Sequence, residues 1–163
     1  MMIIDGKKEA EILRQEIKKE IESLKSKDKK VPGLTVILIG DFAPSQIYVK
    51  NKEKSAEEVG INSSVVRYSK EVTEEEILKK IENLNNDKNV SGILVQLPLP
   101  PQIKKEKIIN AVSPKKDVDG FHPINVGNLS SGHHALVPCT PLGCLYLIKK
   151  VEKNLSGKHA VII

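Results

Sequence analysis

The chain has 163 residues, of which 39% are hydrophobic and 29% charged, a balance typical of a folded domain that excludes a disordered chain. No apolar run could span a bilayer and no signal-peptide pattern opens the chain, so the sequence predicts a cytoplasmic protein without a membrane partner. The formal net charge is +5, but aromatic residues are only 3% and the lysines alternate with glutamates. This pattern disfavours nucleic-acid binding and favours a solvated basic surface that suits a small anionic substrate.

Helix and strand patterns alternate along the first half of the chain. Apolar residues at spacings of three and four predict an amphipathic helix over residues 8–24, and a continuous β-branched run predicts a buried strand over residues 34–40. A short strand is predicted over residues 65–68. Thr73 and Glu76 form a capping-box pattern that predicts the start of another helix. Such alternation predicts an α/β domain with a mainly parallel sheet flanked by helices.

A helix is also predicted over residues 46–59, directly after the first strand, with Ser45 or Asp41 as its N-cap and Gly60 as its C-cap. Its first turns should therefore point toward the crevice where ligands bind in open α/β sheets.

Tyr48 and Lys52 lie four residues apart and share one face of this helix. A lysine beside an aromatic ring can lose solvation, which favours the neutral amine and makes it available as a base. The alternative is an ordinary exposed lysine, like its neighbours Lys50 and Lys54.

Residues 90–101 contain a second buried strand, centred on residues 93–95, that ends at Gln96 and a run of prolines beginning at Pro98. A polar amide at the carboxyl end of a buried strand needs hydrogen-bond partners, and a ligand can be one of them. The alternative is that Gln96 only closes a loop.

After the prolines, the pattern predicts a helix over residues 104–112 and an ordered loop over residues 113–123. Asp117 and Asp119 in this loop are either turn formers or carboxylates that clamp paired N–H donors of an amino-pyrimidine.

The last part of the chain predicts a helix that begins with Thr140 as N-cap and Pro141, followed by a strand that starts at Leu155 and reaches Ile163. Cys139 and Cys144 lack partners at zinc-ligand spacing, which indicates reduced thiols and no metal site.

Several long motifs occur together in one order, and with them the chain resembles the family of bifunctional methylenetetrahydrofolate dehydrogenases/methenyltetrahydrofolate cyclohydrolases. The resemblance runs in register over nearly the whole chain, from the fourth residue onward. The motifs that carry it are residues 45–52 (SQIYVKNK), 92–100 (GILVQLPLP), 116–123 (KDVDGFHP), 125–127 (NVG) and 138–141 (PCTP).

This resemblance implies NADP-dependent oxidation of 5,10-methylenetetrahydrofolate to the 5,10-methenyl form, followed by its hydrolysis to 10-formyltetrahydrofolate. It implies a homodimer when the protein is intact, and a basic surface suits the polyglutamate tail of cellular folates. It also implies three segments: a folate-binding catalytic domain over residues 1–139, a connecting helix over 140–154, and the first strand of a truncated Rossmann-type NADP-binding domain over 155–163.

The resemblance assigns roles to four residues. Lys52 handles protons and assists the attack of water on the bridging carbon, while Tyr48 stacks on the aminobenzoate ring and orients Lys52. Gln96 holds Lys52 or the folate ring, and Asp119 binds the amino-pyrimidine edge of the pterin. The other pocket residues that it implies are Val95, Leu97, Pro98, Pro138 and Cys139.

In the family, the glycine signature that binds the dinucleotide follows the strand that begins near Ala160, and this sequence stops before that signature. The resemblance therefore implies that the residues that bind NADP lie beyond Ile163. We expect hydride transfer by these residues alone to be weak or lost, whereas cyclohydrolase chemistry needs no dinucleotide. The alternative is a non-catalytic folate-binding or dimerisation fragment.

Overall fold

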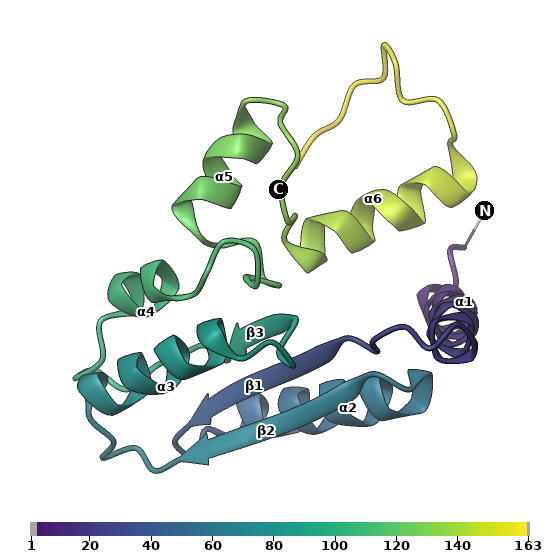
Figure 1. Ribbon diagram of the computed structural model, residues 1–163. Coiled ribbons are helices and arrows are strands. Elements are labelled where there is room, and N and C mark those ends of the chain that lie inside the picture. The colour runs from purple at the N-terminus through teal and green to yellow at the C-terminus, as the bar shows by residue number, and fades with distance from the viewer. Residues whose placement is uncertain (1–2, 163) are drawn as a thin grey trace.

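The computed structural model describes residues 3–162 and shows an α/β fold (Figure 1). Its elements in chain order are α1 (Gly6–Ser26), β1 (Gly33–Ile39), α2 (Ala43–Val59), β2 (Asn62–Tyr68), α3 (Glu74–Asn86), β3 (Gly92–Val95), α4 (Lys105–Ala111), α5 (Pro123–Ser130) and α6 (Cys139–Val151).

The three strands form one parallel sheet in the order β2-β1-β3. In the central strand, Val36 lies opposite Val65 of β2 on one side and Leu94 of β3 on the other. The parallel sheet confirms the predicted fold class. It also brings the carboxyl ends of all three strands to the same edge of the sheet.

The main core lies on the face of the sheet that α3 and α4 cover. Ile37 and Ile39 of β1 pack there with Ile77 and Ile81 of α3 and with Ile108 of α4. These side chains recur at the spacings expected for one helical face and one strand face. Their burial fixes α3 and α4 against the sheet.

A smaller core lies on the opposite face, which α2 covers. Val36 and Leu38 of β1 pack there with Val49 of α2 and Leu94 of β3. Because β1 is buried on both faces, its sequence is a continuous apolar run rather than an alternating one. Helices on both sides of the sheet make a three-layer arrangement.

The structure confirms two of the predicted helix caps and corrects a third. Gly60 ends α2 with φ of 84°, in the left-handed region that glycine adopts without strain. Thr73 and Glu76 form the capping box of α3. However, α2 begins at Ala43, and neither Asp41 nor Ser45 caps it. Ser45 lies inside the first turn, so its hydroxyl is free to bond elsewhere.

The region after residue 122 differs most from the predictions. Helix α5 was not predicted, because its start uses the His122 side chain, which accepts a hydrogen bond from the Ile124 backbone N–H. Helix α6 starts at Cys139 without a side-chain cap, so the prediction that Thr140 is the N-cap is wrong.

The strand predicted from Leu155 to Ile163 is not formed in its described part, residues 155–162. A strand needs a neighbour for its backbone hydrogen bonds, and no strand within residues 3–162 pairs with this segment. Ile163 itself lies outside the described residues, so the prediction of a strand at this position, and of NADP-binding residues beyond it, stays a prediction.

Two further observations concern the described residues as a whole. Between residues 3 and 162, no helix is long and apolar enough to cross a membrane. No group of three His, Cys, Asp or Glu side chains in this range could hold a metal ion.

The caps give the first testable prediction. Thr73→Ala removes a hydroxyl that accepts from the Glu76 backbone N–H, and we expect it to lower the free energy of unfolding by about 1 kcal/mol. Thr140→Ala is the control, because α6 has no side-chain cap, and it should change stability by less than about 0.5 kcal/mol. Urea denaturation measures both. Equal losses in the two variants would contradict the capping assignment.

Candidate functional site

The candidate site centres on a hydrogen bond between Lys52 of α2 and Gln96, which directly follows β3. The Lys52 Nζ donates to the Gln96 Oε1 over 3.1 Å, although the two residues are far apart in the sequence. Lys52 is half-buried, on the side of α2 that faces the sheet. The amino group is therefore held by a neutral acceptor rather than by a carboxylate.

Gln96 is fixed by three further contacts. Its backbone N–H donates to the Ile37 carbonyl of β1 over 2.9 Å, which extends the sheet by one residue. Its side-chain Nε2 donates to the Leu97 carbonyl over 2.8 Å, and the Ser45 hydroxyl donates to the same carbonyl over 3.3 Å. With Nε2 committed to Leu97, the amide oxygen is the atom that faces Lys52.

Asp119 supplies a carboxylate to the same region, since it lines one groove together with Lys52. Burial raises the pKa of Asp119 above its usual value, the Lys52 ammonium opposes this rise, and the nearby Asp117 carboxylate adds to it. The desolvation effect is the largest of the three. A half-buried carboxylate that lies near a lysine is typical of functional sites.

The loop that carries Asp119 is braced by Asp117, which is only 6% exposed. The Asp117 carboxylate accepts from the His122 backbone N–H over 2.8 Å and from the Asn125 Nδ2 over 2.9 Å. The Ile93 N–H of β3 donates to the Lys116 carbonyl over 2.7 Å and ties the loop to the sheet. Asp117 thus acts as a structural acceptor, and Asp119 is the carboxylate left facing the groove.

Gly120 lets this loop approach the segment before α6. Its φ is 66°, and a Cβ at this position would lie 2.6 Å from the Leu136 carbonyl oxygen and 2.8 Å from the Pro138 nitrogen. Neither distance is compatible with a side chain, and the conformation is also strained for other residues. Glycine here therefore brings Pro138 and Cys139 beside Asp119.

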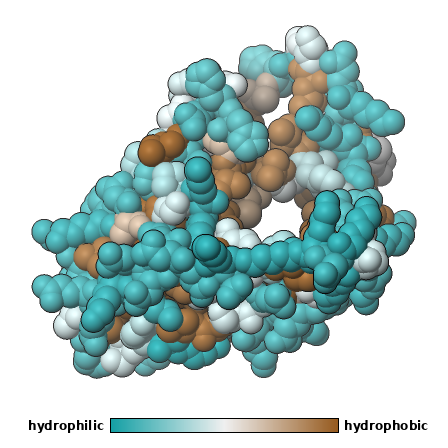
Figure 2. All heavy atoms as spheres, viewed as in Figure 1, coloured by the Kyte–Doolittle hydropathy of each residue, from teal (hydrophilic) through white to brown (hydrophobic). Residues whose placement is uncertain are grey.

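Two hollows meet at Asp119. The larger is a groove of about 600 Å³, with Lys52, Asp119 and Cys139 in its wall and apolar side chains from α1, the strands and the 113–122 loop around them. Figure 2 shows the molecule hollowed between its two halves, with apolar residues gathered near the opening. The smaller is a cavity of about 20 Å³. It suits about one water molecule, so of these two hollows the groove is the one that is large enough for a small-molecule ligand.

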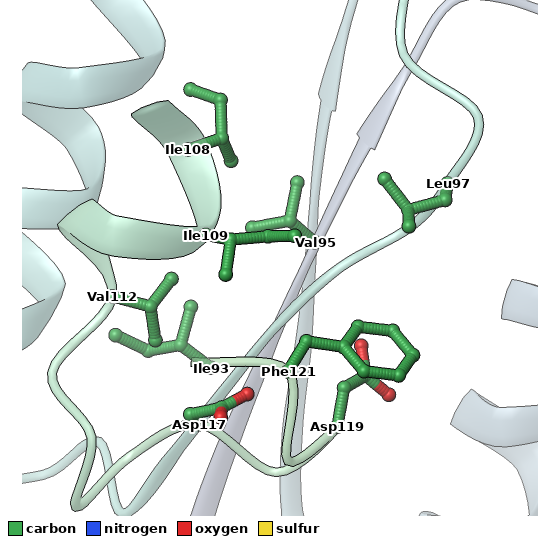
Figure 3. Close-up of a pocket in the computed structure, with 9 residues that line it drawn as sticks. All are labelled: Ile93, Val95, Leu97, Ile108, Ile109, Val112, Asp117, Asp119 and Phe121. Atoms are coloured by element: carbon green, nitrogen blue, oxygen red, sulfur yellow. The ribbon is translucent and has the colours of Figure 1, made fainter. Parts of the chain in front are cut away.

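The small cavity lies between β3, α4 and the loop of Asp117 and Asp119 (Figure 3). Figure 3 shows both aspartates entering it from the same loop, with Val95 and Leu97 in its wall. Two of the predicted pocket residues therefore border this cavity rather than the groove.

The structure brings together Lys52, Gln96, Asp119 and Cys139 of the predicted residues, with Pro138 directly adjacent. The Cys139 thiol lies 3.7 Å from the Val118 carbonyl oxygen, to which it donates. Tyr48, by contrast, is 62% exposed, and within residues 3–162 no hydrogen bond joins its hydroxyl to Lys52. Pro98 is also exposed.

Sequence reasoning missed two parts of the site. Ser45 was considered only as a helix cap, although it precedes Lys52 by two full helical turns and so lies on the same face. The brace between Asp117, His122 and Asn125 had no recognisable signal, because its hydrogen bonds depend on how the loop folds back on itself.

The fold and site define a parallel α/β domain with a lysine, an amide and a carboxylate gathered near the carboxyl ends of its strands. Residues 4–119 match the model of the family described as "Tetrahydrofolate dehydrogenase/cyclohydrolase, catalytic domain". The chain therefore belongs to this family.

Individual relatives agree with this assignment. The chain is 62% identical over 163 residues to the bifunctional protein FolD of Pelagibacter ubique, covering 100% of this chain and 58% of that protein. It is 52% identical over 161 residues to FolD of Streptococcus pyogenes, covering 99% of this chain and 57% of the relative. The chain thus spans less than two thirds of the length of the curated relatives it matches.

Solved structures give the same result. The Campylobacter jejuni FolD methylenetetrahydrofolate dehydrogenase/cyclohydrolase superimposes with a TM-score of 0.91 at 47% identity, over 95% of this chain and 55% of that one. The Trypanosoma brucei methylenetetrahydrofolate dehydrogenase-cyclohydrolase, complexed with NADP and an inhibitor, gives 0.87 at 33% identity, over 91% and 51% of the two chains.

The raised pKa of Asp119 predicts how this residue affects stability. At neutral pH the folded state holds a partly desolvated charge, so Asp119→Asn should raise the free energy of unfolding by up to about 1 kcal/mol. The gain should shrink as the pH falls toward the ordinary range of an aspartate, because Asp119 is then protonated in both states. Urea denaturation across a pH series measures this trend.

Asp117→Asn is the matched control, and we expect it to lower stability by about 1–3 kcal/mol, because the Asp117 carboxylate accepts two buried hydrogen bonds. A loss of stability in Asp119→Asn at neutral pH would contradict the assigned burial cost.

Proposed function

We propose that this chain is the folate-binding catalytic part of an enzyme of tetrahydrofolate one-carbon interconversion. The observation that carries the proposal is the bond between Lys52 and Gln96, because Lys52 also lines a groove that contains Asp119. Membership of the family supports it. In the whole protein, the reactions would be the NADP-dependent oxidation of 5,10-methylenetetrahydrofolate and the hydrolysis of the methenyl product to 10-formyltetrahydrofolate.

The pterin of the substrate would bind through Asp119. A carboxylate accepts two hydrogen bonds side by side, which matches the paired N–H donors of an amino-pyrimidine edge. The apolar lining of the groove would bury the ring faces. The exposed ring of Tyr48, which lies one helical turn before Lys52, would be free to stack on the aminobenzoate part of the substrate.

Lys52 would carry the hydrolysis. The methenyl carbon is bonded to two nitrogens that share a positive charge, so it is attacked readily by water. A bound cation disfavours a second positive charge nearby, so the neutral amine of Lys52 can take a proton from the attacking water. The hydroxyl of the tetrahedral adduct then loses its proton as the bond from carbon to N5 breaks. N5 takes up one proton, so the formyl group stays on N10 and the proton held by Lys52 is released to solvent.

The oxidation requires NADP, and residues 3–162 do not fit this cofactor. Within this range, no strand is followed by a glycine-rich turn that opens a helix, the arrangement that binds a dinucleotide pyrophosphate. The loop between β1 and α2 has Gly40 but no second glycine before the helix. We therefore assign NADP binding to a part of the whole protein beyond Ile163 and derive no step through it.

We further propose the remaining properties of the whole protein from the family and from charge. Residues 1–139 would be the catalytic domain, 140–154 the connecting helix and 155–163 the start of the NADP-binding domain. The intact protein would be a cytoplasmic homodimer that supplies one-carbon units to purine and amino-acid biosynthesis. The net charge of +5 on this chain suits polyglutamylated folates, and a salt-independent affinity for them would contradict this point.

The test is hydrolysis of 5,10-methenyltetrahydrofolate by the chain without dinucleotide. Lys52→Met keeps the apolar length of the side chain but removes the amine, and we expect kcat to fall by about 100-fold or more, as for loss of a general base. Lys50→Met is the matched control, because Lys50 is exposed on the same helix, and its kcat should stay within about twofold.

Unchanged turnover in Lys52→Met would overturn the role of this lysine. If the unaltered chain binds folate without turnover, and Asp119→Asn abolishes that binding, the chain is a folate-binding fragment rather than an enzyme.

A further inference from the structure

Ser45 is a buried serine whose hydroxyl makes no hydrogen bond within its own helix. It lies in the first turn of α2, is only 3% exposed, and does not cap its own helix. The other buried residues on this face of the helix are Val49, Ala56 and Val59, which are all apolar. A buried hydroxyl costs free energy unless it is hydrogen-bonded, so the partner of Ser45 is informative.

That partner belongs to the site. The Ser45 hydroxyl donates to the Leu97 carbonyl over 3.3 Å, and the Gln96 Nε2 donates to the same oxygen over 2.8 Å. Two donors therefore hold one carbonyl from two elements, α2 and the segment after β3. The carbonyl has two lone pairs, and both are engaged.

The orientation of the Gln96 amide follows from this carbonyl. Its two ends are nearly equal in size, so only hydrogen bonding distinguishes them. With Nε2 on the Leu97 oxygen, Oε1 accepts from the Lys52 Nζ over 3.1 Å. The reversed amide would place its NH₂ group against the Lys52 amine and its oxygen against the Leu97 oxygen, so both bonds would be lost.

We propose that Ser45 is a positioning residue that holds the Lys52 amine in place through the Leu97 carbonyl and the Gln96 side-chain amide. Ser45 and Lys52 lie seven residues apart on one face of α2. The helix thus holds both ends of a series of hydrogen bonds, which runs from Ser45 through Leu97 and Gln96 to Lys52. Ser45 makes no contact with the reacting atoms in this arrangement.

The consequence for catalysis rests on the function proposed above. Ser45→Ala removes one of the two donors to the Leu97 carbonyl and should lower kcat for methenyltetrahydrofolate hydrolysis by about fivefold to tenfold, with KM within about twofold. Ser45→Cys has nearly the size of serine and a weaker donor, and it should give an intermediate loss. It also serves if Ser45→Ala fails to fold.

A double-mutant cycle with Gln96→Ala separates positioning from a general effect on the fold. If Ser45 acts through Gln96, then Ser45→Ala should change kcat by less than about twofold when Gln96 is already alanine. Val49→Ala is the control for a loosened helix, because Val49 is fully buried one turn away and makes none of these hydrogen bonds. It should lower the Tm without changing kcat. Independent, additive losses from Ser45 and Gln96 would overturn the proposal.

A measurement without substrate distinguishes failure of this proposal from failure of the proposed function. The Gln96 side-chain amide has its own NMR signals, and in Ser45→Ala its hydrogen exchange should rise by about fivefold as the Leu97 carbonyl loosens. This change should be absent in Val49→Ala. An unchanged Gln96 amide in Ser45→Ala overturns the positioning role, whatever the activity. If the exchange of the Gln96 amide rises in Ser45→Ala but the unaltered chain shows no turnover, the positioning role is supported and the proposed function is contradicted.

Discussion

The burial of β1 on both faces is the constraint on which the rest of the structure depends. One face packs on α3 and α4 and the other on α2, so the strand cannot shift without disturbing both cores. Parallel pairing with β3 then places Gln96 immediately beyond the sheet, where its backbone still bonds to Ile37. Helix α2 directly follows β1 and packs across one face of the sheet. Lys52 therefore reaches Gln96 at the end of β3 without any long loop. The central contact of the site is thus a product of sheet topology.

The polar groups around this contact are interdependent. The Asp117 carboxylate accepts hydrogen bonds from His122 and Asn125. Asp119 is therefore the carboxylate that faces the groove. Its burial is unfavourable for a charge, and the nearby Lys52 compensates only in part. Such a cost is typical of sites where function rather than stability has selected the residue. The neutral Gln96 holds Lys52 without neutralising its charge.

Periodicity and cap chemistry predicted the first half of the fold well, because each signal there is local. The apolar spacing of α1, the continuous run of β1 and the capping box of α3 all depend on neighbouring residues. Helix α5 and the unpaired segment after α6 were not predicted correctly, since an unusual histidine cap and the absence of a pairing strand within residues 3–162 are tertiary facts.

The site residues likewise divide into those with a local sequence signal and those whose placement depends on tertiary contacts. Tyr48, Lys52 and Gln96 could be selected from their places on elements that follow strand ends, and Asp117 and Asp119 were both candidates in the loop. The family motifs then singled out Asp119 and added Cys139. No pattern in the sequence could show that Tyr48 points to solvent or that Val95 and Leu97 face a separate small cavity. These outcomes depend on which side of a short segment packs against another element. The path from Ser45 to Lys52 likewise needs the folded loop after β3.

The doubly engaged Leu97 carbonyl also limits which groups of the site can recognise a ligand. With both lone pairs taken by Ser45 and Gln96, this carbonyl has no hydrogen bond to offer an incoming molecule. Recognition of polar groups on a ligand must then come from other residues, because apolar contacts separate close analogues by only about 10–200-fold. A carboxylate such as Asp119, in the role proposed for it, can instead reject an analogue without matching donors by about 10⁴–10⁵. In that proposed role, Asp119 would make selection strict at the amino-pyrimidine end of a ligand, whereas the apolar stretches of the groove wall would discriminate less.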